Sequence, residues 1–435
     1  MNPSGEGRAR PEACPDERPR RRVYLRTFGC RANQYDTEIV RALIESGGGE
    51  IVATPDEADV AVFNSCAVTA AAEAELRQSV RGAARRRPSL RTVVMGCAAA
   101  RDTGTIAALP SVRAVIAGAD LPGVAMALGL PASAPVPNVQ TGTRALLRIQ
   151  DGCDEHCTFC ATTLARGGAR SRDVSALVDE AARLAEHHPE IVVTGIHIGH
   201  YGVDTGDPRD SLSHLVARLV REVPGVRFRL SSLEATEVDD QLLELFGERG
   251  RLVPHLHAPL QSGSDRVLKR MGRHWYTAAS YAGAVERLAS RVSGFALGAD
   301  VIAGFPGESD EDHGATLALV RALPFTYLHV FPYSPRAGTA AERLAGSVPP
   351  AVAGQRAREL RALGERADAE HRARRLGQTC DLVVMGGAPR REGLTEDYLN
   401  VDVDPSIPRG TRWRATLAGD PARLLGVPLE PIIRA

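Results

Sequence analysis

Residues 144–160 read RALLRIQDGCDEHCTFC, a short apolar stretch that leads directly into three closely spaced cysteines. Cys153, Cys157 and Cys160, here called the barrel set, form a C-x3-C-x2-C run that is one thiol short of a closed tetrahedral metal site. His156 adjoins Cys157, which makes shared tetrahedral ligation awkward, and the sequence has no second C-x2-C pair. An iron–sulfur cluster held by three thiolates leaves one iron open for an outside ligand. The spacing therefore favours such a cluster over structural zinc.

The stretch at residues 144–150 is the first of about six strand-like segments that alternate with helical ones, such as residues 174–187 and 210–222. Repeated strand–helix units of this kind predict a full or partial parallel barrel. Residues 350–375 have the pattern of a charged helix, and the short alternating runs after Gly377 predict a small all-β module. The other strand-like segments are residues 190–199, 226–234, 253–263, 294–308 and 326–335.

Three further cysteines, here called the N-terminal set, each follow a strand-like segment in the first part of the chain. Cys30 follows RRVYLRTFG, Cys66 ends ADVAVFNSC and Cys97 ends RTVVMGC, with helical patterns between them. We expect Asp36 to cap the first of these helices. The alternation predicts a parallel α/β sheet, in which ligands lie beyond the carboxyl ends of the strands. Two interpretations stay open, namely three buried structural thiols or a second three-thiolate cluster with an open iron.

Composition excludes several classes of protein. With 53 basic and 53 acidic residues, the net charge argues neither for nor against nucleic acid binding. Eight cysteines in 435 residues are too few for a disulfide scaffold, and no run of about 18 apolar residues could span a bilayer. The polar, basic start of the chain lacks the apolar core of a signal peptide. We therefore expect a cytoplasmic protein with no membrane partner.

Changes in residue composition and pattern divide the chain into four parts. Residues 1–22 are polar and Pro-rich and predict a disordered tail, and residues 128–143 (LGLPASAPVPNVQTGT) predict a linker. Cys14 and Cys380 belong to neither cysteine set, and we interpret both as incidental. The expected domains are an N-terminal α/β domain at residues 23–132, a barrel at residues 139–373 and a β module at residues 374–435.

The order of motifs along the chain resembles the methylthiotransferase family of radical S-adenosylmethionine enzymes. The C-x3-C-x2-C run, with Phe159 before its last cysteine and a barrel strand ahead of it, matches the radical S-adenosylmethionine signature. TFGCRANQYDTE, NSCAVT and GCAA, around the N-terminal set, match the first domain of the family. The resemblance continues through EIVVTGIHIGHYG, LSSLEATE, HLHAPLQSGSDRVLKRMGR, ADVIAGFPGE and HVFPYSPRAGT, and covers nearly the whole chain after the tail.

Within the family, the first motif separates the branches. GCRANQYDTE resembles the motif of the branch that modifies N6-threonylcarbamoyladenosine in tRNA, and TGIHIGHYG and HVFPYSPRAGT favour the same branch. The isopentenyladenosine branch and the ribosomal-protein branch are alternatives with the same chemistry. A non-catalytic iron–sulfur protein that binds RNA is the alternative from another class.

The resemblance implies two [4Fe–4S] clusters and S-adenosylmethionine as cofactors. The barrel set would be catalytic: its cluster would bind S-adenosylmethionine and cleave it to a 5′-deoxyadenosyl radical in a closed cavity. The cluster on the N-terminal set would hold the sulfur that is inserted, as a methylthio group, at C2 of the adenine beside the anticodon. tRNA is then the substrate, and a reductase or flavodoxin-type electron donor and a sulfur donor are partners.

The resemblance also implies five residues that contact S-adenosylmethionine. Thr194 and Gly195 end the second barrel strand and would contact the amino group of the cofactor, the alternative being an ordinary turn. Glu234 and Gln261 lie at later strand ends and would reach its ribose or carboxylate, unless they form ion pairs or face solvent. Gly304 would let the backbone approach the adenine, or it simply ends a strand. We assign no metal to His197, His200, His255 and His257.

By the same resemblance, the β module is a TRAM domain that binds RNA. Its arginines would track phosphates while Trp413 or Tyr398 stacks on a base, and an ordinary charged surface is the alternative. The arginines in question are Arg390, Arg391, Arg409, Arg412 and Arg414.

The loop after the barrel set departs from the family pattern. Thr162–Ala169 lacks the usual hydrophobic, Pro and Tyr positions and keeps Arg166 and Gly167. We expect the change to affect contacts with the substrate and to leave metal binding intact.

Overall fold

The computed structural model describes residues 21–67, 70–131, 137–207, 209–248, 251–386 and 391–432. Nearly all of the predicted tail, with Cys14, lies outside these ranges, as do Arg390 and residues 132–136 of the predicted linker. No helix in the described ranges is long and apolar enough to cross a membrane.

The N-terminal unit is a wholly parallel sheet with the strand order β2-β1-β3-β4-β5. The strand order reverses at β1, and the carboxyl ends of β1, β3 and β4 meet at one edge, where such sheets bind ligands. Apolar residues of α1 and α3 pack on one face and those of α2 on the other, which confirms the predicted α/β class. The elements are β1 (Arg22–Thr27), α1 (Arg31–Ser46), β2 (Glu50–Val52), β3 (Val60–Ser65), α2 (Ala70–Arg86), β4 (Arg91–Gly96), β5 (Val112–Ala117) and α3 (Leu121–Leu128).

The first helix begins earlier than the sequence predicted. α1 starts at Arg31, and Cys30 occupies its N-cap position. Asp36, the predicted cap, is instead buried inside the helix, where it forms ion pairs with Arg148 and Arg166. The prediction was wrong because a local pattern does not distinguish a capping acid from a buried one whose partners lie far away in the sequence.

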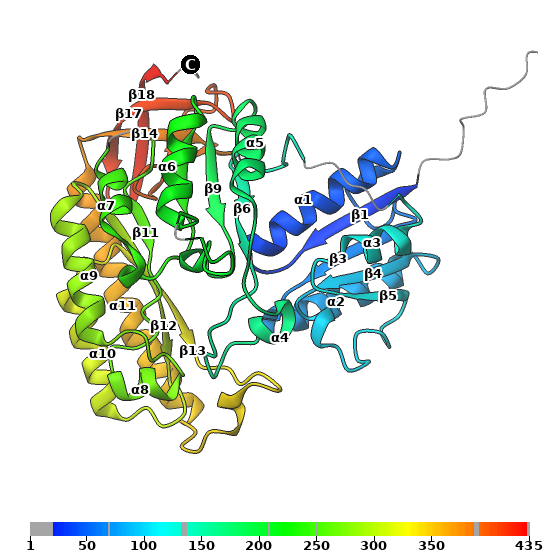
Figure 1. Cartoon of the computed structure of the whole chain (residues 1–435), viewed down its shortest axis with the longest axis horizontal. Coiled ribbons are helices and arrows are strands. Elements are labelled where there is room, and N and C mark those ends of the chain that lie inside the picture. The colour runs from blue at the N-terminus through cyan, green and yellow to red at the C-terminus, as the bar shows by residue number, and fades with distance from the viewer. Residues whose placement is uncertain are drawn as a thin grey trace, which may run out of the picture.

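Six parallel strands form the second unit as two three-stranded sheets, β6-β9-β10 and β11-β12-β13. Parallel bridges from Phe228 to Leu252 and from Ser232 to His257 join the two sheets into one arc. No described strand links β13 back to β6, so the barrel is partial, with its helices on the outside (Figure 1). The strands are β6 (Ala145–Arg148), β9 (Glu190–Thr194), β10 (Arg227–Leu230), β11 (His255–His257), β12 (Ala296–Ala303) and β13 (Tyr327–Pro332).

The helices of the barrel follow its strands in the predicted alternation. α11 spans Pro350–Arg375, as predicted, so the expected domain boundary at residue 374 falls within its last turn. The domain boundaries therefore remain predictions. The other elements of this unit are β7 (Gln150–Asp151), α4 (Thr162–Arg166), β8 (Arg170–Ser171), α5 (Val174–Ala185), α6 (Leu212–Glu222), α7 (Asp240–Gly247), α8 (Asp265–Arg270), α9 (Ala278–Arg291) and α10 (Asp310–Ala322).

The last part of the chain is a closed five-stranded barrel with the order β14-β15-β16-β18-β17, which confirms the predicted all-β module. Cys380 lies in its apolar core beside Leu382 and Leu417, in keeping with an incidental thiol. The strands are β14 (Thr379–Val384), β15 (Arg391–Thr395), β16 (Asn400–Val403), β17 (Arg412–Asp420) and β18 (Arg423–Pro431).

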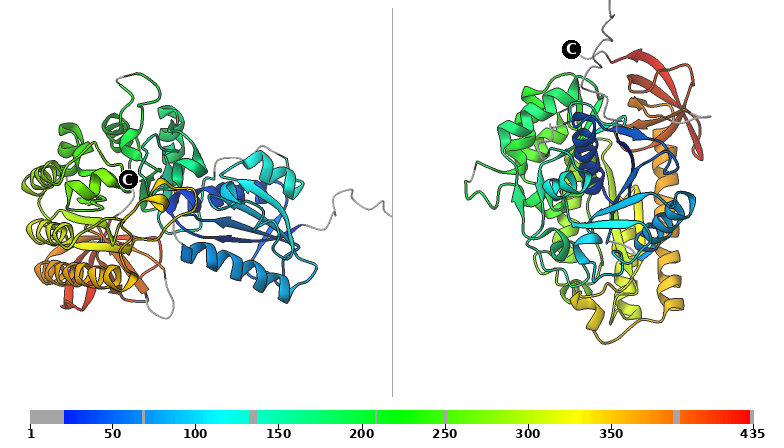
Figure 2. Two further views of the ribbon diagram at one scale, coloured as in Figure 1. Left: turned by 90° about the horizontal axis from the view of Figure 1, so that it is seen from below. Right: turned by 90° about the vertical axis from the view of Figure 1, so that its right-hand side faces the viewer.

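Two arginines of β10 attach the β module to the large barrel. Arg227 and Arg229 are fully buried and both pair with Glu190. They also donate to backbone carbonyls of the module, Arg227 to Leu394 at 3.0 Å and Arg229 to Thr395 at 2.9 Å. Burial alone would raise the pKa of Glu190, but the arginines hold it well below its usual range. This network holds the module at the end of the barrel where β9 and β10 begin, and Figure 2 shows the module against the barrel.

Candidate active site

The N-terminal set lies together at the carboxyl edge of the first sheet. Cys30, Cys66 and Cys97 follow β1, β3 and β4, which are neighbouring strands. Gly29 has a φ of +94°, and a Cβ there would lie 2.5 Å from the Cys66 Sγ, so the glycine lets the turn after β1 approach Cys66. Burial raises the pKa of Cys97 to about 11, and the charges of Cys30 and Cys66 act in the same direction. The sheet order and the approach of Gly29 to Cys66 place the three cysteines at one edge of the sheet.

Asn33, in the first turn of α1, ties together the loops that carry this set. Its side-chain amide donates to the backbone carbonyls of Phe28 and Ser65, both at 2.9 Å. Its side-chain oxygen accepts from Arg166 at 2.7 Å. Asn33 was not among the predicted site residues, because nothing near it in the sequence marks these distant partners.

The barrel set lies in the loop between β7 and α4. A backbone hydrogen bond of 2.8 Å from Thr158 to the carbonyl of Met271 anchors this loop to the end of α8. Burial raises the pKa of Cys157 to about 12; Arg273 opposes this shift, and the other two thiols of the set add to it. The structure thus brings these three cysteines together as well.

Both sets have the donor chemistry of a thiolate-bound iron–sulfur site. The backbone N–H of Thr162 donates to the Cys160 Sγ at 3.3 Å, and Arg166 Nε donates to the Cys97 Sγ at the same distance. Hydrogen bonds of this kind stabilise thiolates and tune the metal. Among the described cysteines the one left over, Cys380, lies in the β module, so neither set has a fourth cysteine at hand.

Arg166, the last residue of α4, links the two sets. Its buried guanidinium donates to the Cys97 Sγ and to the carboxylates of Asp36 and Asp151, at 2.7 and 2.9 Å. Burial alone would lower the pKa of Arg166, but the charges of Asp36, Cys97 and Asp151 raise it, so the side chain stays cationic. Because Asp151 ends β7 directly before the loop of the barrel set, one side chain joins the start of that loop to a thiol of the N-terminal set. α4, which carries Arg166, lies between the two units (Figure 1).

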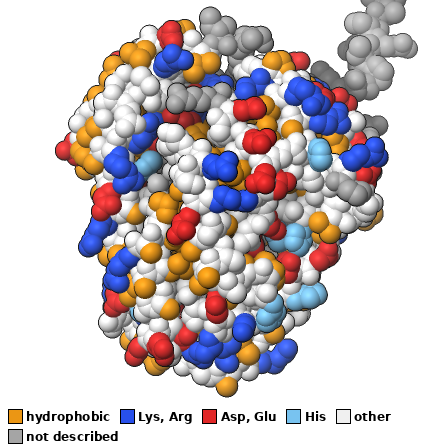
Figure 3. Space-filling model, turned by 60° about the vertical axis from the view of Figure 1, so that its left-hand side comes forward, with side chains coloured by type: hydrophobic (Ala, Val, Ile, Leu, Met, Phe, Trp, Pro, Cys, Tyr) orange, Lys and Arg blue, Asp and Glu red, His pale blue; other side chains and the backbone are white. Residues whose placement is uncertain are grey.

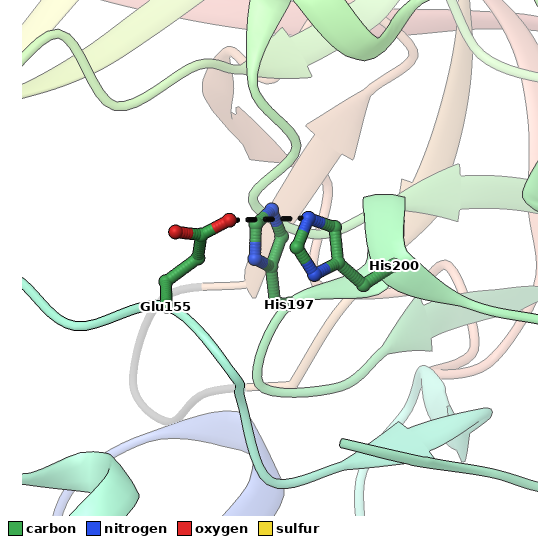
Figure 4. A group of neighbouring side chains, drawn as sticks. All are labelled: Glu155, His197 and His200. Carbon is green, nitrogen blue, oxygen red and sulfur yellow. Dashed lines mark ion pairs between the residues drawn. The ribbon is translucent and has the colours of Figure 1, made fainter. Parts of the chain in front are cut away.

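A stacked pair of histidines lies beside Cys153 of the barrel set, and Figure 4 shows the two facing rings with Glu155. His197 Nδ1 lies 3.8 Å from the Cys153 Sγ, and its Nε2 lies 2.8 Å from Glu237. His200 stacks on His197 with ring centroids 3.8 Å apart and lies 3.5 Å from Glu155. Burial lowers the pKa of His197, but its hydrogen bonds to Cys153 and Glu237 raise it to about 10. The ligand atoms of Glu155, His197 and His200 lie within 4.8 Å of one another, and the assignment of no metal here stays a prediction.

Thr194 and Gly195 lie where β9 passes the strand that leads to the barrel set. Thr194 is buried, and its carbonyl oxygen accepts from the backbone of Ile149 at 2.9 Å. A Cβ on Gly195 would lie 2.9 Å from the carbonyl oxygen of Gln150, so a glycine is needed for the two backbones to approach. Contact of both residues with a cofactor stays a prediction.

Glu234 belongs to the surroundings of Cys157. Arg273 donates to the Cys157 Sγ at 3.5 Å and also to the carboxylate of Glu234, which accepts from Trp275 as well. Burial raises the pKa of Glu234 although Arg273 opposes the shift. The ion pair that was the alternative prediction for Glu234 is thus present, beside the barrel set.

Gln261 and Gly304 both have left-handed backbone conformations. Gln261 has a φ of +62° and bridges to Val301 of β12 through its backbone. Gly304 has a φ of +76°, and a Cβ there would lie 2.3 Å from the Cβ of Ala353 on α11. Packing against α11 therefore accounts for the glycine, and its contact with adenine stays a prediction.

Several side chains of the β module that were predicted to contact RNA instead bond to, or stack on, other residues of the protein. Arg409 donates to the hydroxyl of Thr143 and to the carbonyl of Thr141, both at 2.8 Å. Tyr398 stacks on His255 of the barrel, with ring centroids 4.4 Å apart, instead of facing outward. Figure 3 shows basic and acidic side chains interspersed over one face of the molecule. Arg391, Arg412 and Trp413 bond within the module, and exposed Arg414 pairs with Glu430.

Comparison with known proteins decides the family. Residues 22–118 match the family described as uncharacterized protein family UPF0004, and residues 147–320 match the radical SAM superfamily. The chain is 35% identical over 406 residues to the threonylcarbamoyladenosine tRNA methylthiotransferase MtaB of Bacillus subtilis, covering 87% of this chain and 89% of that protein. The chain belongs to the radical S-adenosylmethionine methylthiotransferase family.

Other relatives of this methylthiotransferase also align with most of the chain. The threonylcarbamoyladenosine tRNA methylthiotransferase MtaB of Thermotoga maritima is 35% identical over 376 residues, 82% of this chain and 85% of that protein. The tRNA-2-methylthio-N(6)-dimethylallyladenosine synthase of Chlorobium phaeovibrioides is 34% identical over 392 residues, 85% of this chain and 87% of that protein. The radical S-adenosylmethionine methyltransferase TsrM of Kitasatospora setae shares the fold, with a TM-score of 0.55 and 14% identity over 74% of this chain and 77% of that one.

Family membership confirms the predicted cofactors and the enzyme class. The protein is a radical S-adenosylmethionine methylthiotransferase, a class of enzyme that uses S-adenosylmethionine and [4Fe–4S] chemistry.

Proposed function

We propose that this methylthiotransferase modifies C2 of N6-threonylcarbamoyladenosine beside the anticodon of tRNA, and that it holds two [4Fe–4S] clusters. The barrel set holds one cluster, where S-adenosylmethionine binds, and the N-terminal set holds the other. When bound, the first supplies an electron for cleavage of S-adenosylmethionine and the second supplies the sulfur that is transferred.

The observation that carries this proposal is the link made by Arg166. Two metal sites that act on one adenine must face it from a short distance, because a radical and its sulfur donor react only in contact. Arg166 reaches the Cys97 Sγ at 3.3 Å and Asp151, at the start of the barrel loop, at 2.9 Å. The two cysteine sets are therefore held as neighbours by a buried, cationic side chain.

The surrounding side chains orient the barrel loop and the cofactor. Arg273 holds Cys157 and Glu234 together, and His197 lies against Cys153. Thr194, Gly195, Gln261 and Gly304 are the proposed backbone and side-chain contacts of S-adenosylmethionine. Their bonds to neighbouring strands would keep that cofactor in one pose and limit access of water.

The choice of N6-threonylcarbamoyladenosine rests on the relatives and on the motif GCRANQYDTE. The relatives from Bacillus subtilis and Thermotoga maritima carry that substrate in their names at 35% identity, but a dimethylallyladenosine enzyme follows at 34%. Overall identity thus supports the choice weakly. An electron donor of the reductase or flavodoxin type, a sulfur donor and a cytoplasmic location belong to the same proposal.

Mass spectrometry of tRNA nucleosides from a deletion strain tests the substrate. We expect 2-methylthio-N6-threonylcarbamoyladenosine to disappear and its precursor to accumulate, and the wild-type chain to restore it where Cys157→Ala does not. An unchanged level in the deletion strain contradicts the proposed substrate. Anaerobic reconstitution tests the two clusters, with about eight iron atoms per chain expected; a plateau at about four contradicts them.

A further inference from the structure

Three polar side chains inside the barrel have no role in the function proposed above. His257, Asp300 and His329, here called the lumen triad, lie on the adjacent strands β11, β12 and β13, and Asp300 and His329 are direct cross-strand partners. Asp300 Oδ1 lies 3.0 Å from His257 Nε2 and 3.3 Å from His329 Nδ1. Both imidazoles thus converge on one carboxylate oxygen.

The alternation along β12 shows that the triad faces the lumen. Ala299 and Val301 are buried in the core beneath the helices, so Gly298 and Asp300 point the other way. A Cβ on Gly298 would lie 1.9 Å from the ring of Tyr327, which shows that this ring lies across the inner face of the strand. Tyr327 donates to or accepts from His257 Nδ1 at 3.2 Å and so fixes the orientation of that imidazole.

The triad is near the proposed cofactor contacts on one side. The backbone carbonyl of Asp300 accepts from the backbone of Gln261 at 2.8 Å, and a parallel bridge places His257 beside Ser232 just beyond the end of β10. His257 ends β11, whereas Asp300 and His329 lie within β12 and β13, so the triad faces the lumen below the carboxyl ends of these two strands.

On its other side the triad is connected to the N-terminal unit. The ring of Tyr327 stacks on that of Tyr398, with centroids 5.5 Å apart, and the Tyr398 hydroxyl accepts from Arg31 at 3.3 Å. Arg31 directly follows Cys30 in the chain. A chain of side-chain contacts thus runs from the triad through Tyr327 and Tyr398 to Arg31, at the start of α1.

The triad is partly open, and His329 is its most accessible member. Its side chain is 53% exposed, against 29% for Asp300 and 11% for His257. His329 uses Nδ1 toward Asp300, so its Nε2 is directed to the opposite side of the ring. Burial raises the pKa of Asp300, but the hydrogen bonds of the two histidines lower it below its usual range, so the carboxylate is ionised.

We propose that the lumen triad is the subsite for the polar N6 side chain of the substrate, and that His329 contacts the carboxylate of that side chain. This inference rests on the proposed function. A threonylcarbamoyl group carries a carboxylate, a hydroxyl and a urea, whereas a dimethylallyl group has no hydrogen-bonding atom. Seating the apolar group would strip water from Asp300 and His329 without replacing their hydrogen bonds, which is costly.

The subsite also gives a physical reason why the enzyme would prefer N6-threonylcarbamoyladenosine to dimethylallyladenosine, a choice that sequence identity to the relatives does not decide. A pocket built to hydrogen-bond a polar group rejects an analogue that lacks it far more strongly than an apolar pocket discriminates by size. We therefore assign the choice between the two modified adenosines to the lumen triad, with His329 as the residue that determines specificity.

Binding of three anticodon stem–loops to the reconstituted enzyme tests this inference. They carry N6-threonylcarbamoyladenosine, its carboxyl methyl ester or dimethylallyladenosine at the same position. We expect the wild type to bind the first at least about tenfold more tightly than the ester, as for a hydrogen bond to a charged group. His329→Leu should bind the free acid more weakly by about the same factor and should bind the ester almost as the wild type does. His329→Gln should lose less affinity for the free acid than His329→Leu.

The controls separate recognition from damage to the fold. His187→Leu changes a histidine of similar exposure, 46%, just after α5, and should bind all three stem–loops as the wild type does. Iron content and melting temperature of His329→Leu should match those of the wild type. Equal losses of His329→Leu on the acid and the ester, or no loss on either, overturn the inference.

The outcome also distinguishes this inference from the function on which it rests. If the wild type does not methylthiolate the threonylcarbamoyl stem–loop, the proposed substrate fails and the inference with it. If the wild type methylthiolates that stem–loop, and His329→Leu has the KM of the wild type and its preference for the acid over the ester, the subsite alone is refuted.

Discussion

The two cysteine sets reach similar arrangements by opposite routes. The barrel set occupies one loop between β7 and α4, so its three thiols are close together whatever the rest of the barrel does. The N-terminal set draws one cysteine from the end of each of β1, β3 and β4, so its thiols meet only when the parallel sheet forms. A loop site is thus recognisable from spacing, and a sheet-edge site depends on correct packing of the whole domain.

The largest expected effect comes from removing one cysteine of either set. Cys157→Ala should abolish both 5′-deoxyadenosine release and methylthiolation, because the barrel set is proposed to bind S-adenosylmethionine. Cys66→Ala should abolish methylthiolation while 5′-deoxyadenosine still forms. Mass spectrometry of both products in a single anaerobic assay measures the contrast. If Cys66→Ala also stops 5′-deoxyadenosine release, the two sets do not divide the reaction as proposed.

The next effect concerns the residue that joins the two sets. Arg166→Met leaves the buried carboxylate of Asp36 with Arg148 as its ion-pair partner, and we expect a loss of about 3 kcal/mol in the free energy of unfolding. Urea titration followed by circular dichroism measures the loss.

A double variant and a surface control sharpen the test of Arg166. Arg166→Met combined with Asp36→Asn should recover part of the stability, because the double variant no longer buries a carboxylate that has lost one of its two arginine partners. Arg209→Met changes an exposed arginine paired with Asp207 at the surface and should leave the urea midpoint unchanged. A midpoint for Arg166→Met that equals that of Arg209→Met would show that the link between the sets contributes nothing to stability.

A smaller effect tests the dependence of the N-terminal set on sheet geometry. Gly29→Ala puts a Cβ 2.5 Å from the Cys66 Sγ at a φ of +94°, which should cost about 2 kcal/mol and reduce the iron bound by that set. Iron analysis with urea titration measures both. Release of 5′-deoxyadenosine should persist, because the barrel loop is untouched.

Gly82→Ala is the matched control for Gly29→Ala. Gly82 lies in α2 of the same domain with nothing within 4 Å of its added Cβ, so the change should stabilise by up to about 1 kcal/mol and leave the iron content unaltered. Equal iron losses in both variants would contradict a specific role for Gly29.

Some features were predictable because they depend on short stretches of sequence. The apolar alternation of the strands indicated the order of the three units, and α11 spans the range predicted from its charged pattern. The strand ends at Cys30, Cys66 and Cys97 predicted a shared edge, and the sheet order places them there. Asp36 was assigned wrongly, since its partners Arg148 and Arg166 belong to the barrel.

The sequence by itself determined the fold class, the family and the spacing of the barrel set, because spacing within a loop and strand–helix alternation are local properties of the chain. Tertiary structure decided that Arg166 reaches across to Cys97, that Tyr398 of the β module stacks on His255, and that His329 meets Asp300. Each of these contacts joins side chains from different strands or domains. Their partners are chosen by burial and packing of the whole chain, and no local pattern of residues encodes that choice.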